Sequence, residues 1–124
     1  MEISEITVEE LANKLKSQDQ FILLDVREPS ELEQAKITDA RLEVVPMSQL
    51  GREGTGALSE SARSKGAEIY VMCHTGSRSL QVTGWLASKG WTNVHNVAGG
   101  IDERIGKQHR DLLFAGTIEE AQSP

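Results

Sequence analysis

The sequence predicts an α/β fold of three layers, in which a parallel sheet lies between helices on both of its faces. Residues 21–24 and 69–72 are short, continuous apolar runs, which are typical of strands buried on both faces. Segments with helical periodicity alternate with the predicted strands, and this alternation is typical of a parallel sheet covered by helices. A chain of 124 residues is most simply one domain with a core of its own.

The first predicted helix covers residues 8–17. The hydroxyl of Thr7 can accept a hydrogen bond from the backbone of Glu10, whose side chain can reach back to Thr7, and this reciprocal pattern is a capping box. One face of the helix is apolar, formed by Val8, Leu11 and Leu15. A short edge strand is predicted within residues 1–5.

The segment after the strand at 21–24 is predicted to contain two charged residues, a short helix and another strand. Asp25 and Arg27 follow the strand directly, at the sheet edge where open α/β proteins place their ligands, although an ordinary salt bridge is the alternative interpretation. A second capping-box pattern after Pro29, formed by Ser30 and Glu33, predicts a helix to about residue 35. The chain is then predicted to form a strand at 40–45, a turn of helix at 48–50, a flexible surface loop at 51–56 and a short helix at 58–65.

The only cysteine, Cys73, lies in a short loop at 73–78, between a predicted strand and a helix predicted at 79–89. Backbone N–H groups and the helix dipole stabilise a thiolate at a helix start, so we expect the pKa of Cys73 to fall below the free value of about 8.5. Gly76 allows the loop to turn its N–H groups inward, and Arg78 adds a permanent cation. The loop therefore predicts an anion-binding ring around a sulfur nucleophile. The alternative is that Cys73 is a small buried apolar residue.

The last predicted strand covers residues 94–97, and the two glycines at 99–100 allow a close turn before a helix at 101–109. Residues 115–124 are polar and are expected to form a frayed tail. We therefore expect a single domain at 1–114.

Charge and cysteine content exclude several classes of protein. The formal net charge is −6 and no basic run occurs, which argues against nucleic acid and anionic membrane surfaces as partners. One cysteine excludes an internal disulfide and an all-cysteine zinc site, and His95 and His109 lack the spacing of a metal pair, so we expect no metal. A free thiol, with no apolar span of membrane length and no secretory signal, favours the cytoplasm.

Three segments of the chain together resemble the single-domain rhodaneses, a family of sulfurtransferases. The resemblance spans about residues 5–110, and the segments have the family's order and spacing. They are Leu24-Asp25-Val26-Arg27-Glu28, Cys73-His74-Thr75-Gly76-Ser77-Arg78-Ser79 and Asn96-Val97-Ala98-Gly99-Gly100-Ile101.

The resemblance implies a sheet of five parallel strands in the order 1-5-4-2-3. It implies that Cys73 cycles between thiolate and persulfide, that Arg78 belongs to the catalytic loop, and that Asp25 and Arg27 form a supporting shell. It implies no metal or organic cofactor. The backbone N–H groups that would cradle the persulfide or the anionic group of the donor belong to His74, Thr75, Gly76, Ser77 and Arg78.

The chain departs from the family pattern in three places. His74 stands where members that use thiosulfate often have Arg or Lys, and a mostly neutral imidazole suits a dianion less well than a fixed cation does. Residues 35–40 replace the common sequence Gly-His-Ile-Pro-Gly-Ala, and Arg104 stands where a Trp is common. We expect these last two departures to affect packing and to leave the fold intact.

The function implied by the resemblance is that of a thiosulfate sulfurtransferase. It would move a sulfane sulfur from an anionic donor, thiosulfate or a persulfide, to an acceptor that is cyanide, a thiol or a protein. The alternatives are a non-enzymatic sulfur carrier or binding module, and a phosphatase or arsenate reductase. Only four residues separate Cys73 from Arg78, one fewer than in protein tyrosine phosphatases, so the ring is expected to be too tight for a phosphoryl group, and arsenate reduction would need further thiols.

Overall fold

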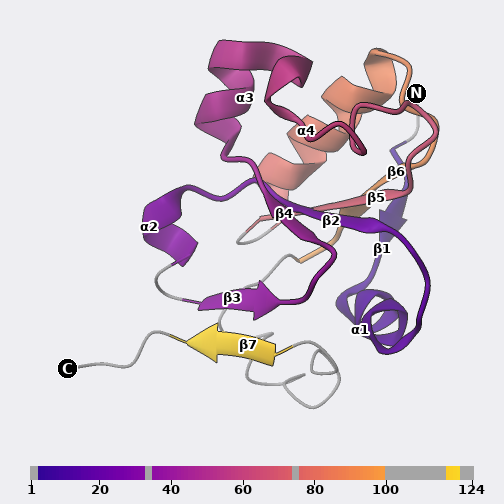
Figure 1. The fold of residues 1–124 in the computed structure, drawn as a ribbon, viewed down its shortest axis with the longest axis vertical. Helices are drawn as coiled ribbons and strands as arrows, with labels where there is room; N and C mark the ends of the chain where they lie inside the picture. The colour runs from indigo at the N-terminus through magenta and orange to yellow at the C-terminus, as the bar shows by residue number, and fades with distance from the viewer. Residues whose placement is uncertain (1–2, 33–34, 74–75, 100–116, 121–124) are drawn as a thin grey trace.

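The computed structural model describes residues 3–32, 35–73, 76–99 and 117–120, and its strands form two sheets (Figure 1). The main sheet has five strands in the order β1-β6-β5-β2-β4, and every pair is parallel. Counted along the chain without β3, this order is 1-5-4-2-3, so the predicted fold class and strand order are confirmed. The strands are β1 (Glu5–Ile6), β2 (Ile22–Asp25), β4 (Leu42–Val44), β5 (Ile69–Met72) and β6 (Val94–Val97).

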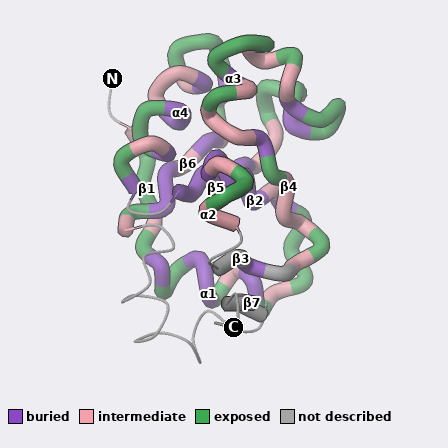
Figure 2. Tube along the Cα trace, turned by 90° about the vertical axis from the view of Figure 1, so that its left-hand side faces the viewer, coloured by how far each residue is buried: buried purple, intermediate pink, exposed green. Residues whose placement is uncertain are grey.

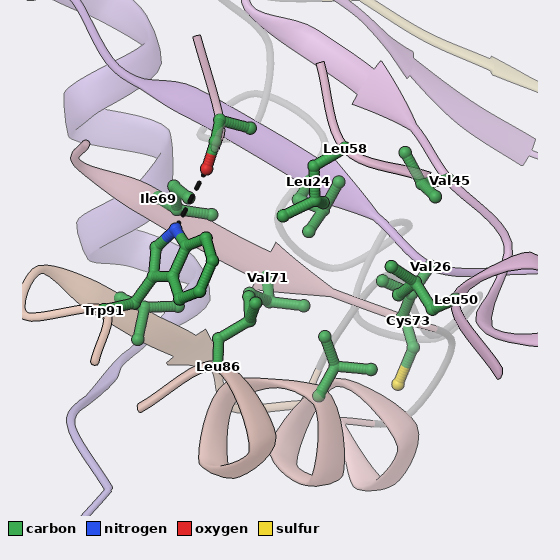
Figure 3. Close-up of a cluster of buried hydrophobic side chains, with 13 residues drawn as sticks. Leu24, Val26, Val45, Leu50, Leu58, Ile69, Val71, Cys73, Leu86 and Trp91 are labelled. Atoms are coloured by element: carbon green, nitrogen blue, oxygen red, sulfur yellow. Dashed lines mark hydrogen bonds between the residues drawn. The ribbon is translucent and has the colours of Figure 1, made fainter. Parts of the chain in front are cut away.

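Helices cover both faces of this sheet. Alternate side chains of the central strands point to opposite sides, and apolar side chains on both sides are buried by the helices. Leu23 and Tyr70 pack with α1 (Val8–Lys16) on one face. Leu24 and Val71 pack on the other face, in the cluster of buried side chains drawn in Figure 3, with α3 (Met47–Glu53) and α4 (Ser77–Ser88). Figure 2 shows β2 and β5 buried between these layers. No helix in the part of the chain that the structure describes is long and apolar enough to cross a membrane.

The start of α1 confirms the predicted capping box. The hydroxyl of Thr7 accepts a hydrogen bond from the backbone N–H of Glu10 at 3.1 Å, and the Glu10 carboxylate accepts one from the backbone N–H of Thr7 at 3.1 Å. Both N–H groups would otherwise lack partners at the helix start, so the sequence pattern and the structure agree on the same physical cause.

The glycine-rich segment at 51–56 is not the flexible loop that the sequence predicts. Helix α3 continues through Gly51 to Glu53, and a 3₁₀ turn, η1 (Gly54–Ala57), follows it. Gly54 has a φ of +63°, a backbone conformation that favours glycine, and it ends the helix there. The glycine therefore marks a defined helix end.

The prediction of a helix at 58–65 is also wrong, because this segment forms a series of turns. Leu58 and Ala62 are buried with the helical spacing of four residues, which explains the prediction. Their backbone carbonyls have other partners: the Trp91 indole N–H donates to the Ala62 carbonyl at 2.9 Å, and Arg63 Nε donates to the Leu58 carbonyl at 3.0 Å. One helix-type bond is present, from the Arg63 backbone N–H to the Ser59 carbonyl oxygen at 3.0 Å, but it does not extend into a helix.

The helix predicted to reach residue 35 is shorter than expected. Helix α2 (Pro29–Leu32) begins at Pro29, and residue 35 already belongs to a strand, β3 (Ala35–Thr38). This strand pairs antiparallel with β7 (Thr117–Glu120), which lies within the range predicted as a frayed tail. Glu33 of the proposed second capping box and the helix predicted at 101–109 lie outside the described residues.

Candidate active site

Cys73 lies at the carboxyl edge of the sheet, directly after β5, with its side chain fully buried. The neighbouring strand β2 ends at Asp25, which pairs in register with Met72, so the two predicted functional segments start side by side. In Figure 3, Cys73 lies at one end of the buried cluster, with its sulfur directed away from Val26 and Leu50. The fold therefore places the thiol where parallel α/β proteins place their chemistry.

Among the described residues, two backbone N–H groups point at the Cys73 sulfur. Gly76 donates at an N···S distance of 3.1 Å and Ser79 at 3.3 Å. Helix α4 begins at Ser77, two residues before the predicted start, so Arg78 and Ser79 belong to its first turn. These donors belong to a helix start, where N–H groups lack helical partners, so they are available to stabilise negative charge on the sulfur.

Gly76 is the residue that makes this loop geometry accessible. It precedes α4 with a φ of +98°, and a Cβ atom at this position would lie 3.0 Å from the backbone nitrogen of Gly99. Gly99 follows β6 and also has a positive φ, of +88°. Two glycine-containing segments that the sequence analysis singled out separately therefore touch beside the thiol, and each needs glycine for that approach.

A buried chain of polar groups runs from Cys73 to the edge of the sheet. The Cys73 sulfur lies 3.4 Å from Ser79 Oγ, which lies 2.5 Å from Asn96 Oδ1. Asn96 Nδ2 donates to the Glu5 carboxylate at 2.8 Å. No sequence pattern assigns a role to Ser79 or Asn96, and it is the structure that shows both polar side chains to be buried.

Arg78 forms a bidentate ion pair with Glu31 of α2. Its Nη1 and Nη2 lie 2.6 and 2.5 Å from the two carboxylate oxygens. This pairing is the largest of the effects that lower the pKa of Glu31 from 4.5 to about 2, so the carboxylate is charged at neutral pH. No pattern in the sequence indicates this role of Glu31, which is only an intervening residue of the capping-box pattern formed by Ser30 and Glu33.

Asp25 and Arg27 form an ion pair that is almost completely buried, with side-chain exposures of 0% and 2%. Arg27 donates to the Asp25 carboxylate from its backbone N–H at 3.0 Å, from Nε at 3.1 Å and from Nη2 at 2.9 Å. Its Nη1 lies 3.4 Å from the Glu31 carbonyl oxygen. The pair therefore reaches Arg78 indirectly, through the segment that holds Glu31.

The structure thus brings together several of the predicted site residues at one sheet edge: Cys73, Gly76, Arg78, Asp25 and Arg27. Ser77 is the exposed first residue of α4. His74 and Thr75 lie outside the described residues. Among the described residues, no group of three or more His, Cys, Asp or Glu side chains is arranged to hold a metal ion.

Known proteins resemble this chain in sequence. A chloroplast protein of Arabidopsis thaliana, a rhodanese-like/PpiC domain-containing protein, is 37% identical over 102 residues, which is 80% of this chain. The chain spans only 33% of that protein's length. A sulfurtransferase of Allochromatium vinosum is 30% identical over 99 residues and is matched over 80% of this chain and 85% of its own.

A solved structure and a family model also resemble this chain, and both are rhodanese-like. The crystal structure of a rhodanese-related protein from Thermoplasma volcanium has a TM-score of 0.63 and 30% sequence identity, and it covers 84% of this chain and 92% of its own. The model of the rhodanese-like domain matches residues 7–105. Together with the named sulfurtransferase, these matches support a general role in sulfur transfer. The chain belongs to the rhodanese-like domain family.

Proposed function

We propose that this protein is an enzyme that transfers a sulfane sulfur through a persulfide on Cys73. The donor is thiosulfate or a persulfide, and the acceptor is cyanide, a thiol or a protein. The observation that carries the proposal is the pair of N–H groups, from Gly76 and Ser79, that point at the buried sulfur. We also place this activity in one domain at 1–114 and in the cytoplasm, where a free thiol stays reduced.

The first half-reaction loads the cysteine. The Cys73 thiolate attacks the outer sulfur of thiosulfate, a new S–S bond forms, and the old S–S bond breaks. The electron pair of the broken bond leaves with sulfite, so the transferred sulfur carries one negative charge as the end of the Cys73 persulfide. Atoms and charges balance without an oxidant or a reductant.

The second half-reaction removes the transferred sulfur from Cys73. A nucleophile such as cyanide attacks the outer sulfur of the persulfide, and thiocyanate leaves while the electron pair returns to the Cys73 sulfur as thiolate. The same N–H groups stabilise negative charge in both halves, because the charge always lies on or next to that sulfur. A thiolate that is already formed needs no general base, so a partner histidine is not required.

The spacing between Cys73 and Arg78 also supports sulfur as the transferred group. Four residues separate them, and the donors at 3.1 and 3.3 Å converge on the cysteine sulfur itself. A persulfide adds one atom at that position, whereas a phosphoryl group on sulfur needs room for three oxygens. We therefore expect background activity on aryl phosphates.

Mass spectrometry tests the proposal. Incubation with thiosulfate should add the mass of one sulfur atom to the unmodified protein and nothing to Cys73→Ser, and addition of cyanide should remove it again. Steady-state release of thiocyanate separates an enzyme from a carrier, because a carrier loads once and turns over slowly. Cys73-dependent hydrolysis of an aryl phosphate, with no loading of sulfur, would contradict the proposal.

A further inference from the structure

The positive charge of the catalytic loop is matched by a negative charge from another element. Arg78 uses both Nη atoms to hold the two carboxylate oxygens of Glu31, at 2.6 and 2.5 Å. Both side chains are about two-thirds buried, with exposures of 31% and 29%. A bidentate pair of this geometry is stronger and better defined than a typical surface ion pair. The guanidinium therefore does not face the loop as an isolated cation.

Glu31 is itself held in place by other groups. Its carboxylate accepts a hydrogen bond from the Glu28 backbone N–H at 2.9 Å. Its carbonyl oxygen lies 3.4 Å from Nη1 of Arg27, which the buried Asp25 carboxylate fixes. The pKa of Glu31, lowered to about 2 chiefly by Arg78, keeps the carboxylate charged at any physiological pH. The counter-charge is therefore a permanent part of the site.

This neutralisation affects the two candidate donors differently. Thiosulfate carries two negative charges and gains most from an uncompensated cation. A persulfide on a thiol carries at most one negative charge at the sulfur that is transferred. The net charge of −6 on the whole chain adds no attraction for a dianion at longer range. Pairing Arg78 with Glu31 therefore penalises thiosulfate more than a thiol persulfide.

We propose that Glu31 determines donor specificity, and that by neutralising Arg78 it makes a thiol persulfide, rather than thiosulfate, the preferred sulfur donor. The inference rests on the proposed function, since it assigns a donor class to the same Cys73. The transfer balances as before: the Cys73 thiolate attacks the terminal sulfur of the persulfide, the S–S bond of the donor breaks, and its electron pair leaves with the carrier thiolate.

The test compares the unmodified protein with Glu31→Gln, which keeps an oxygen to accept a hydrogen bond from Arg78 but removes the charge. Glu60→Gln is the matched control, because Glu60 is exposed and the change in net charge is the same. The rate of persulfide formation on Cys73 is measured by mass spectrometry against the concentration of each donor. The donors are thiosulfate and the persulfide of 2-mercaptoethanol, whose carrier has no charge of its own.

We expect Glu31→Gln to raise kcat/KM for thiosulfate about threefold to tenfold, mainly through a lower KM. This is the range for one uncovered charge that acts on a dianion at a site about one-third exposed to solvent. The persulfide should respond less, so the ratio of the two efficiencies shifts toward thiosulfate. The thiosulfate reaction should also become more sensitive to salt in Glu31→Gln. Glu31→Asp, which keeps the charge, should retain the original donor preference, and Glu60→Gln should change nothing.

Several outcomes would overturn the inference. An unchanged donor ratio in Glu31→Gln, or an equal loss with both donors, would show that Glu31 has a structural role only. A preference for thiosulfate in the unmodified protein would also overturn it, and this measurement needs no variant to fold. If neither donor loads Cys73 in the unmodified protein, the proposed function itself fails and the inference fails with it.

Discussion

The buried pair of Asp25 and Arg27 allows a stability prediction that can be worked out from the structure. Asp25→Ala removes the carboxylate that accepts three of the hydrogen bonds that Arg27 makes from its side chain, and the guanidinium stays in a site with 2% exposure. Its remaining hydrogen bond in the described structure is long, at 3.4 Å to the Glu31 carbonyl oxygen. The variant therefore leaves a buried charge without the carboxylate that pairs with it.

Removing one partner of a buried ion pair costs about 3–5 kcal/mol, because the other charge stays desolvated. Against a total stability of about 5–15 kcal/mol for a domain, this loss is large, and it corresponds to a fall in Tm of roughly 10–20 °C. Arg27→Met in the Asp25→Ala background should recover part of the loss, since it removes the orphaned charge.

Asp39→Ala is a matched control, because Asp39 and Arg41 have the same spacing and a similar bidentate geometry at 2.9 and 3.0 Å. That pair is more exposed, at 11% and 16%, and Arg41 also donates to backbone carbonyls, including that of Leu15 at 2.9 Å. We expect Asp39→Ala to cost only about 1–2 kcal/mol. Urea unfolding measures both variants. A loss for Asp25→Ala no larger than that for Asp39→Ala would refute the reasoning.

Three further predictions concern the loop and its ion pair. Cys73→Ser should abolish sulfur loading and leave the urea midpoint close to that of the unmodified protein; turnover near the original rate would rule out Cys73 as the nucleophile. Gly76→Ala should cost about 1–3 kcal/mol and slow loading, because φ is +98° and the new Cβ would lie 3.0 Å from Gly99 N; an unfolding midpoint equal to the original would contradict this. The pair of Glu31 with Arg78 should stabilise the fold above pH 4.5 and lose that contribution as the pH falls toward 2, since folding lowers the pKa of Glu31. Urea unfolding across this range should show a weaker acid dependence for Glu31→Gln, and identical profiles would exclude the contribution.

The elements that sequence reasoning predicted well are those whose signal is local. The apolar runs of β2 and β5 and the capping box of α1 each depend on residues a few positions apart. The antiparallel pairing of β3 with β7 joins segments about eighty residues apart, and no pattern in either segment indicates the other. The turns at 58–65 show the opposite error, in which a helical spacing of buried residues arises without a helix.

The same distinction applies to the site. The sequence predicted the cysteine, the glycine and the arginine together because all three lie within the six residues 73–78. It did not predict that Glu31 would meet Arg78, since the two residues are 47 positions apart in the chain. Asn96 was quoted in a motif without a role, because only the fold brings its amide to Ser79. Charges and polar groups that complete a site from other elements need the tertiary structure.

The polar chain beneath Cys73 indicates which groups would stabilise the thiolate of the proposed function. A serine hydroxyl has one proton, and Ser79 Oγ lies closer to Asn96 Oδ1, at 2.5 Å, than to the cysteine sulfur, at 3.4 Å. With that proton directed at Asn96, the hydroxyl oxygen accepts from the thiol and offers nothing to a thiolate. The charge is then stabilised by the backbone N–H groups of Gly76 and Ser79, which helix α4 fixes in place. Asn96, itself held by Glu5, therefore serves to hold the first turn of α4, so that its N–H group needs no reorganisation when the sulfur becomes charged.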